Sequence, residues 1–166
     1  MSSRATQKVA MLMGGLSAER EVSLVSGREC AAALRGEGFE VIELDAGADL
    51  AQRLEDLRPD VAFNALHGRW GEDGAVQGLL EWLKIPYTHS GVLASALGMD
   101  KQRSKKAFVE AGLPVVDSKI VAKSNAASQF LLPAPYVIKP SNEGSSVGIY
   151  FVQDGANVLP DLGDDL

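Results

Sequence analysis

The first half of the chain repeats one pattern: a short apolar run, a turn containing Gly or Asp, and a stretch whose apolar residues recur three and four positions apart. The apolar runs predict β-strands at Lys8 to Met13, Glu40 to Leu44 and Asp60 to Asn64. The helical spacing predicts helices at Val22 to Leu34, Leu50 to Leu57 and Ala75 to Leu83. Strands that alternate with helices are typical of parallel βαβ units, so the predicted fold class is α/β with a Rossmann-like parallel sheet.

The balance of residue types argues against several classes of protein. Hydrophobic residues make up 46% of the 166 residues and charged residues 23%, as in soluble globular proteins. A formal net charge of -6, without a basic run, argues against a nucleic-acid partner. The apolar stretches are only as long as strands, and Met1 to Lys8 lacks the apolar region of a secretory signal. We therefore expect a cytoplasmic protein without a membrane partner, in which Cys30 has a packing role.

The sequence changes character after Gly98, where a basic helix opens over residues 99–106. Asp100 is expected to cap that helix. Later strands are predicted at Ser118 to Val121, in the run that starts at Tyr136, and at Ile149 to Val152. The last two read as a β-hairpin with a long connection. We therefore expect a first domain at residues 1–100 and a second at residues 101–166.

Two Gly-rich loops of the first domain are the places to look for a ligand site. They are Gly14 to Glu21, after the first strand, and His67 to Gly74, after the third. Right-handed crossovers bring such strand-to-helix loops together at the carboxyl edge of a parallel sheet, where α/β proteins bind ligands. Glycine also allows the backbone to approach a ligand closely.

These loops carry titratable side chains with two interpretations each. Glu19 and Glu21 could cap the N–H groups of the following helix and interact with its dipole, or one of them could receive an ammonium group at the ligand edge. His67 could make scaffold hydrogen bonds or donate to a substrate carboxylate. No cluster of His, Cys, Asp and Glu has the spacing of metal ligands, so any catalytic Mg²⁺ is expected to take its ligands from elsewhere.

The segment Ser141 to Gly148 joins the two strands of the predicted hairpin and consists mostly of small residues. Their backbone N–H groups can converge on an anion, and the hydroxyls of Ser145 and Ser146 add donors, so phosphate is a suitable ligand. The segment matches neither the P-loop pattern nor the G-x-G-x-x-G pattern. A hairpin turn without a ligand is the alternative interpretation.

Two lysines could add positive charge near that segment. Lys139 follows the apolar run of Tyr136 to Ile138, where a lysine is expected to be poorly solvated without an anionic partner. The alternative is a solvent-facing residue at a strand end. Lys101, after Asp100, offers a second point charge, or only a solvated helix face.

Taken together, five segments resemble the D-alanine-D-alanine ligase family of the ATP-grasp superfamily in their order and spacing. They are residues 14–23, 65–68, 71–74, 99–101 and 139–148. The resemblance runs from about Lys8 to about Val152. It implies that residues 1–100 form a substrate domain and that residues 101–166 begin an ATP-grasp α+β domain for the nucleotide.

The resemblance also implies a reaction. In this family, ATP phosphorylates the carboxylate of one D-alanine, with Mg²⁺ or Mn²⁺ as the metal ion. The amine of a second D-alanine then attacks the acyl phosphate, and the product dipeptide enters the synthesis of bacterial peptidoglycan. Glu19 resembles the carboxylate that binds the ammonium group of the first D-alanine, and His67 resembles a contact to its carboxylate region.

The remaining site residues follow from the same resemblance. Lys101 and Lys139 resemble the lysines at the ATP phosphates. Gly144, Ser145 and Ser146 resemble the loop that closes over the triphosphate, and closure of such a loop would protect the acyl phosphate from water. Ser145 also matches the catalytic serine that orients the attacking amine together with Glu19.

The resemblance implies a longer polypeptide. The metal ligands, the adenine-binding strand and a tyrosine partner of Ser145 are expected beyond Leu166, so these 166 residues alone are expected to lack ligase activity and to bind ATP weakly. Family members are commonly dimers, which predicts a homodimer for the complete protein. Two alternatives stay open: an ATP-grasp ligase with another acceptor, such as D-lactate, and a non-catalytic α/β binding module.

Overall fold

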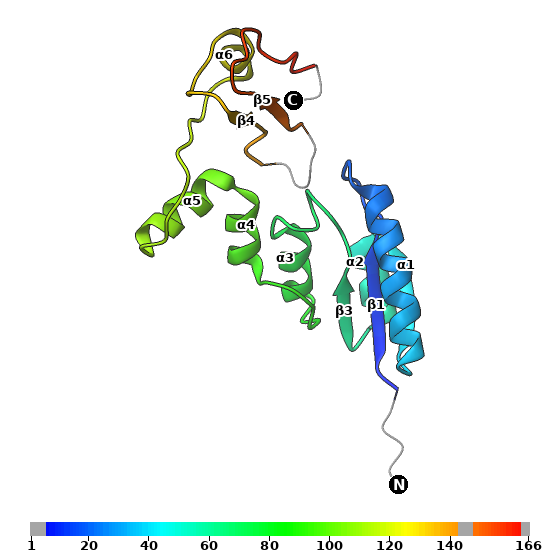
Figure 1. Cartoon of the computed structure of the whole chain (residues 1–166). Coiled ribbons are helices and arrows are strands. Elements are labelled where there is room, and N and C mark those ends of the chain that lie inside the picture. Colours follow the sequence, from blue (N-terminus) through cyan, green and yellow to red (C-terminus); the bar gives the residue numbers. More distant parts are fainter. Residues whose placement is uncertain (1–5, 143–147, 164–166) are drawn as a thin grey trace. The chain divides into compact units, whose positions relative to one another are not determined.

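A computed structural model of the chain describes residues 6–142 and 148–163. The chain divides into two compact units, Met1–Gly98 and Met99–Leu166, whose helices and strands are labelled in Figure 1. The first unit contains three strands and four helices within the described residues, and the second contains two helices and two strands.

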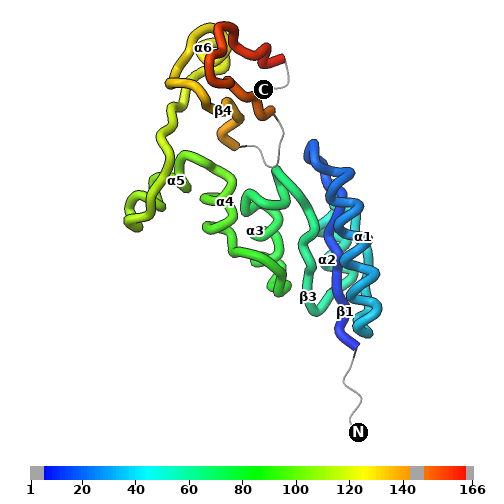
Figure 2. The backbone as a smooth tube through the Cα atoms, in the orientation of Figure 1, coloured from blue at the N-terminus to red at the C-terminus, as the bar shows by residue number. Residues whose placement is uncertain are grey.

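The first unit is built on a three-stranded parallel sheet with the strand order β2-β1-β3. Its strands are β1 (Lys8–Met13), β2 (Glu40–Asp45) and β3 (Val61–Asn64). Leu12 of the central strand pairs with Leu44 on one side and with Asn64 on the other. The carboxyl ends of the three strands therefore lie at one edge of the sheet. In Figure 2 the loops after β1 and β3 both lie at the upper end of the sheet.

Helices cover both faces of this sheet. Successive side chains of a strand point to opposite faces, so each strand packs against helices on both sides. They are α1 (Arg20–Gly36), α2 (Leu50–Leu57) and α3 (Ala75–Trp82). On one face, Met11 of β1 packs in a buried cluster with Ala31 of α1. On the other face, Leu12 of β1 packs with Leu54 of α2 and Leu80 of α3. Accordingly, α1 and α3 lie on opposite sides of the sheet in Figure 1.

The three predicted strands and helices of the first unit are confirmed, with boundaries that differ by at most two residues. Cys30 is half-buried against the cluster that contains Met11 and Ala31, which agrees with its predicted packing role. One helix was not predicted: α4 (Val92–Met99). It consists mainly of strong helix formers, but it is apolar on all sides and so lacks the one-sided period that identifies an amphipathic helix.

The second unit contains α5 (Lys101–Glu110), α6 (Lys123–Ser128), β4 (Tyr136–Ile138) and β5 (Tyr150–Val152). Asp100 caps α5 as predicted, because its carboxylate accepts hydrogen bonds from the N–H groups of Gln102 and Arg103. The predicted hairpin is confirmed as well, since β4 and β5 form an antiparallel pair. Helix α6 was not predicted; its sequence is short and polar.

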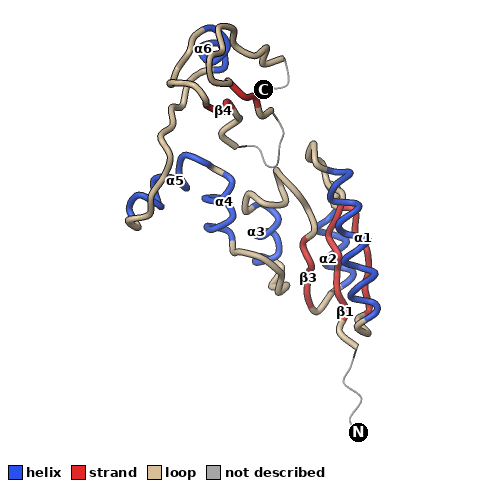
Figure 3. Tube along the Cα trace, viewed as in Figure 1, coloured by secondary structure: helices blue, strands red, loops and turns tan. Residues whose placement is uncertain are grey.

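The strand predicted at Ser118 to Val121 is wrong. These residues form a loop, drawn in tan between α5 and α6 in Figure 3, and Ile120 is 58% exposed. A strand needs a neighbour to pair its N–H and C=O groups, and none of the described strands runs beside this segment. Nearby carbonyls accept from lysines instead, as in the bond from Lys105 Nζ to the Val116 oxygen at 2.8 Å.

None of the helices in the described part of the chain has both the length and the apolar character required to cross a bilayer.

Candidate functional site

Two loops meet at the carboxyl edge of the first unit's sheet. The first loop, residues 14–19, joins β1 to α1, and the second loop, residues 65–74, joins β3 to α3. Helices α1 and α3 cover opposite faces of the sheet. The loops after the neighbouring strands β1 and β3 therefore lead to opposite sides of the sheet. Such a switch point between neighbouring parallel strands is where α/β proteins bind ligands.

An ion pair ties the first loop to the end of β2. The Arg20 guanidinium donates from Nη1 to Asp45 Oδ1 at 2.6 Å and from Nη2 to Asp45 Oδ2 at 2.5 Å. Arg20 Nη1 also donates to the Gly15 carbonyl at 3.1 Å, and the Gly15 N–H donates to Asp45 Oδ1 at 3.2 Å. These four hydrogen bonds form a closed arrangement, which we call the Arg20–Asp45 clamp.

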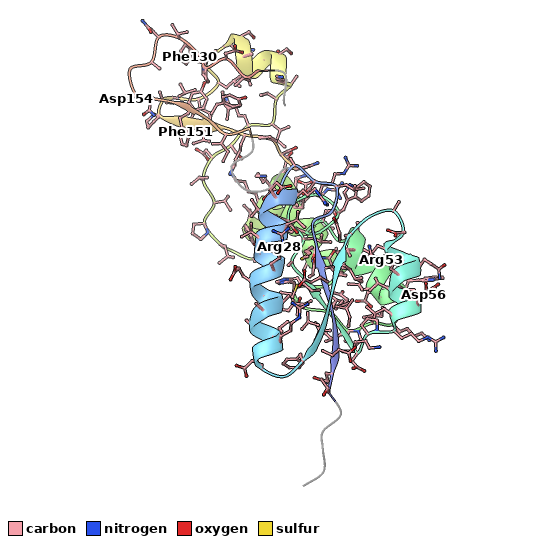
Figure 4. The ribbon with its side chains drawn as sticks, turned by 90° about the vertical axis from the view of Figure 1, so that its right-hand side faces the viewer. Arg28, Arg53, Asp56, Phe130, Phe151 and Asp154 are labelled. Carbon is pink, nitrogen blue, oxygen red and sulfur yellow. The ribbon has the colours of Figure 1, made fainter. Side chains whose placement is uncertain are left out.

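The charges of the clamp stabilise each other. Hydrogen bonding from Arg20 lowers the pKa of Asp45 to about 2, although the partial burial of the carboxylate acts in the opposite direction. The same hydrogen bond raises the pKa of Arg20. Arg53 of α2, labelled in Figure 4, adds a favourable positive charge and donates from Nη1 to the Asp45 carbonyl at 2.9 Å. The clamp is therefore fully ionised near neutral pH.

Two serines join the first loop and α1 to the second loop. The Ser17 hydroxyl donates to the His67 carbonyl at 2.8 Å and accepts from the Glu19 N–H at 3.2 Å. Ser23, which is fully buried on α1, donates from its hydroxyl to the Ala65 carbonyl at 2.7 Å. The backbone on both sides of Glu19 is thus fixed to the second loop.

The Glu19 side chain is buried beside the second loop, with 9% of the residue exposed. Glu19 occupies the N-cap position of α1, but its side chain makes no capping hydrogen bond, so the capping interpretation does not hold for it. Among the described residues, none donates a hydrogen bond to its carboxylate or forms an ion pair with it. A buried carboxylate is stable only with compensating partners, so this group is suited to bind a cation.

Gly68 explains how the carboxylate can approach the second loop. A Cβ atom on Gly68 would lie 2.9 Å from Glu19 Oε1, and the residue has a φ of +67°, which L side chains rarely adopt. A larger residue would therefore displace the carboxylate and strain the turn.

His67 is half-buried in the second loop. Its Nε2 lies 3.3 Å from the Ser26 hydroxyl on α1, and its backbone carbonyl accepts from Ser17. The histidine thus has contacts of the kind that the scaffold interpretation expects. Its contact to a substrate stays a prediction.

Buried amides hold the backbone of the second loop. The Gly71 carbonyl accepts from Asn64 Nδ2 and from Gln77 Nε2, each at 2.8 Å, and Asn64 Oδ1 accepts from the Leu66 N–H at 3.1 Å. Gly71 packs so closely that a Cβ there would lie 2.4 Å from Leu66 Cβ. His89 supports the same region through a 2.7 Å contact from Nε2 to the Asn64 carbonyl.

The two acidic residues of the second loop also maintain its shape. Glu72 Oε2 accepts from the Gly68 N–H at 2.7 Å. Asp73 accepts from the Trp70 N–H at 3.0 Å and from the Ala75 N–H at 3.1 Å, at the start of α3. Their carboxylates are therefore engaged by the loop backbone.

A pocket of about 390 Å³ lies beside the two loops, on the side of the sheet that α2 and α3 cover. Its lining is mostly apolar and includes Leu16, Leu66 and Val76; its polar members are Ser17, His67 and Arg69. Its volume is within the range of small-molecule sites. Glu19 does not line this pocket, so the buried carboxylate and the apolar pocket are separate features of the same sheet edge.

The predicted lysines lie in the second unit. The backbone N–H of Lys101 donates to the Ser141 carbonyl at 3.2 Å, which places the start of α5 beside the beginning of the segment after β4. Lys139 is exposed, so the expectation that it is poorly solvated is wrong. Burial alternates along β4, and Lys139 continues the exposed side that includes Val137. Phe151 on β5, labelled in Figure 4, is also largely exposed.

Three predicted site residues, Gly144, Ser145 and Ser146, lie outside the described residues. In the part of the chain that the structure describes, no group of three or more His, Cys, Asp or Glu residues could hold a metal ion.

Several residues that shape this edge were not singled out from the sequence. Arg20 and Asp45 form the clamp, and Ser17 and Asn64 hold the two loops. A signal for the clamp was present, because Arg20 lies just before the helix predicted at Val22 to Leu34 and Asp45 follows a predicted strand, which brings both to the carboxyl edge. The local pattern does not indicate the bond of Ser17 to the His67 carbonyl, which belongs to the other loop, or the bond of Asn64 to the Gly71 carbonyl, which depends on how the second loop folds back.

The fold and this site define a class: an α/β domain with a parallel sheet whose carboxyl edge carries a buried acidic group and an apolar pocket. The comparison with known proteins is more specific. The family model described as "D-ala D-ala ligase N-terminus" matches residues 43–90. The D-alanine-D-alanine ligase of Dinoroseobacter shibae is 69% identical over 166 residues, which cover all of this chain and 54% of the relative. That of Ruegeria pomeroyi is 68% identical with the same coverage.

Solved structures give the same result. The crystal structure of D-alanine-D-alanine ligase from Bacillus anthracis matches with a TM-score of 0.74 and 37% identity, over 90% of this chain and 50% of that one. The structure of this ligase complexed with ATP matches with a TM-score of 0.73 and 36% identity, over 91% and 50% of the two chains. The chain thus spans about half the length of the curated relatives it matches.

The resemblance inferred from the sequence is therefore confirmed. The chain is similar to the amino-terminal part of the D-alanine-D-alanine ligases. The predicted α/β fold class is confirmed as well.

Proposed function

We propose that the complete protein is an ATP-dependent D-alanine-D-alanine ligase and that this chain supplies the site for the first D-alanine and the beginning of the nucleotide site. The 69% identity to a ligase over the whole chain supports the assignment. The observation that carries it is the Glu19 carboxylate, which is buried at the ligand edge of the sheet and finds no cationic partner among the described residues.

The proposed reaction has two steps. First, an oxygen of the D-alanine carboxylate attacks the γ-phosphorus of ATP, and the bond to the bridging oxygen breaks to release ADP and form an acyl phosphate. The amine of the second D-alanine then attacks the acyl carbon, loses a proton and expels phosphate. The dipeptide is used for peptidoglycan synthesis in the bacterial cytoplasm.

Glu19 has a defined task in this proposal. Its carboxylate pairs with the ammonium group of the first D-alanine, which places the substrate carboxylate for phosphorylation. His67 contacts the carboxylate region of that substrate. In the second step, Glu19 and the catalytic Ser145 orient the attacking amine. Domain roles follow: residues 1–100 bind the amino acid, and residues 101–166 begin the ATP-grasp domain.

Lys101 and Lys139 are proposed to bind the phosphates of ATP, where positive charge stabilises the transferred phosphoryl group. The exposure of Lys139 is compatible with a ligand contact at the end of β4. Gly144, Ser145 and Ser146 are proposed to close over the triphosphate. The ATP complex of the Bacillus anthracis ligase supports ATP as the nucleotide.

The proposal includes Mg²⁺ or Mn²⁺ and a homodimer. The described residues do not include a group that could hold a metal ion, so the metal ligands are proposed to lie in the remainder of the complete ligase. The homodimer rests on the family resemblance alone.

The assignment of Glu19 can be tested in the complete ligase by replacing Glu19 with Gln and measuring ADP release as D-alanine is varied. Loss of the negative charge should raise the KM of the first D-alanine by at least about tenfold, because a charge-assisted hydrogen bond is lost. Glu21→Gln is the matched control, since Glu21 is a neighbouring but exposed carboxylate. Wild-type KM values for Glu19→Gln would contradict the proposal.

A further inference from the structure

The Arg20–Asp45 clamp and Glu19 share one short segment of chain. Arg20 directly follows Glu19, and Gly15, whose N–H and carbonyl the clamp also binds, lies four residues before it. The segment that carries Glu19 is therefore attached at both of its ends to the end of β2. The clamp side chains are about half exposed, so their role is not to fill the core.

The pairing also controls charge. Arg20 is the cation closest to Glu19 in sequence, and an unpaired guanidinium there could compete with a ligand for the Glu19 carboxylate. In the structure, the guanidinium instead forms a bidentate hydrogen-bonded pair with Asp45, the geometry in which Arg binds carboxylates most strongly. The clamp therefore leaves the Glu19 carboxylate available to a cation from outside the chain.

We propose that Arg20 and Asp45 are positioning residues, which hold the Glu19 carboxylate in place for the ammonium group of the substrate. This inference rests on the proposed function of Glu19. Neither residue needs to contact the substrate, and their effect is exerted through the loop of residues 14–19.

The test uses the complete ligase with Arg20→Met, Asp45→Asn and the double variant. Each single variant should raise the KM of the first D-alanine by about tenfold or more, because a displaced Glu19 carboxylate makes a weaker charge-assisted hydrogen bond with the ammonium group of the substrate. The KM of ATP should stay within about twofold of wild type, because the lysines proposed to bind the phosphates of ATP lie in the second unit and are not part of the clamp. The double variant should be no worse than Asp45→Asn, because the two residues act as one unit.

The chain contains a matched control. Arg35 also joins α1 to β2, through an ion pair from Nη1 to Glu43 Oε1 at 2.8 Å and a hydrogen bond from Nη2 to the Val41 carbonyl at 2.9 Å. That pair lies near the opposite end of α1, away from the first loop. Arg35→Met should therefore leave the KM of D-alanine unchanged.

Three results would overturn the inference. Wild-type KM values for D-alanine in both clamp variants would do so, as would equal increases in the KM of D-alanine and of ATP, because a merely structural role predicts the latter. An Arg35→Met variant as impaired as Arg20→Met would also do so. If Glu19→Gln raises the KM of D-alanine while the clamp variants do not, the inference fails and the proposed function stands. If Glu19→Gln is also without effect, the proposed function itself fails.

Discussion

Asp45 is ionised throughout the usual working pH range of proteins, because its bidentate hydrogen bonding with Arg20 lowers its pKa to about 2. An unfolded chain has no such contact, and its Asp45 would titrate near the ordinary value of 3.8. The folded state therefore prefers the ionised carboxylate more strongly than the unfolded state does. This difference links the clamp to the pH dependence of stability.

We predict that part of the stability of the protein is lost as the pH falls from about 4 to about 2, because the unfolded state then binds a proton that the folded Asp45 resists. The contribution is fully present above the unfolded pKa. Thermal unfolding measured across this range should show a steeper decline for wild type than for Asp45→Asn, which has no carboxylate to protonate. Parallel curves for the two proteins would contradict the prediction.

At the scale of elements, the sequence correctly predicts those strands and helices whose apolar periodicity coincides with a face that is buried in the fold. The strands and helices of the first unit were recognised because apolar periodicity coincides with a buried face, as in β1 and α2. Ser118 to Val121 has a strand-like composition but no neighbouring strand, and composition alone does not provide one. Helix α4 was missed for the opposite reason, since it forms without an amphipathic period.

The candidate site was predictable to the level of its loops. The positions of Gly14 to Glu21 and His67 to Gly74 after parallel strands indicated the correct edge of the sheet. The burial of Glu19 could not be predicted, because it depends on the approach of Gly68 from a distant loop. The exposure of Lys139 was likewise not apparent, because it depends on which face of the hairpin is covered.

The packing of the second loop leads to a prediction with opposite signs at two glycines. Gly71→Ala should destabilise the protein by about 1 to 3 kcal/mol, because its Cβ would collide with Leu66. Gly78→Ala should stabilise it by about 0.5 to 1 kcal/mol, because Gly78 lies within α3 and a Cβ there would meet nothing within 4 Å. Denaturant unfolding of both variants would measure the difference, and equal effects would refute this account of the loop.

At the scale of the whole molecule, the two units differ in how much apolar surface they bury. The first unit has a buried cluster on each face of its sheet. Among the described residues of the second unit, the buried apolar side chains are only Ala126, Val152 and Leu162, while Phe130 and Phe151 are largely exposed. Buried apolar area is the main source of stability, so the first unit should be the more stable one.

We predict that hydrogen exchange of this 166-residue chain will show this difference directly. Amides of the central strand β1 should be protected up to the global unfolding free energy, because β1 is paired on both sides and buried. Amides of β4 and β5 should exchange much faster through local opening. Mass spectrometry of peptides from each strand would provide the rates, and equal protection of β1 and the hairpin would contradict the prediction.

The central position of β1 has a further consequence for how the binding edge comes into existence. Val9 of β1 pairs with Val61 of β3, and the second loop begins at the end of β3. Strand β3 can therefore join the sheet only after the long stretch of chain between these residues has closed into a loop. A nascent polypeptide that has formed β1, α1 and β2 already contains Glu19 and the clamp, but it lacks Gly68. Affinity for a ligand at this edge should therefore emerge late in folding, and ligand binding should then draw the equilibrium toward the finished sheet.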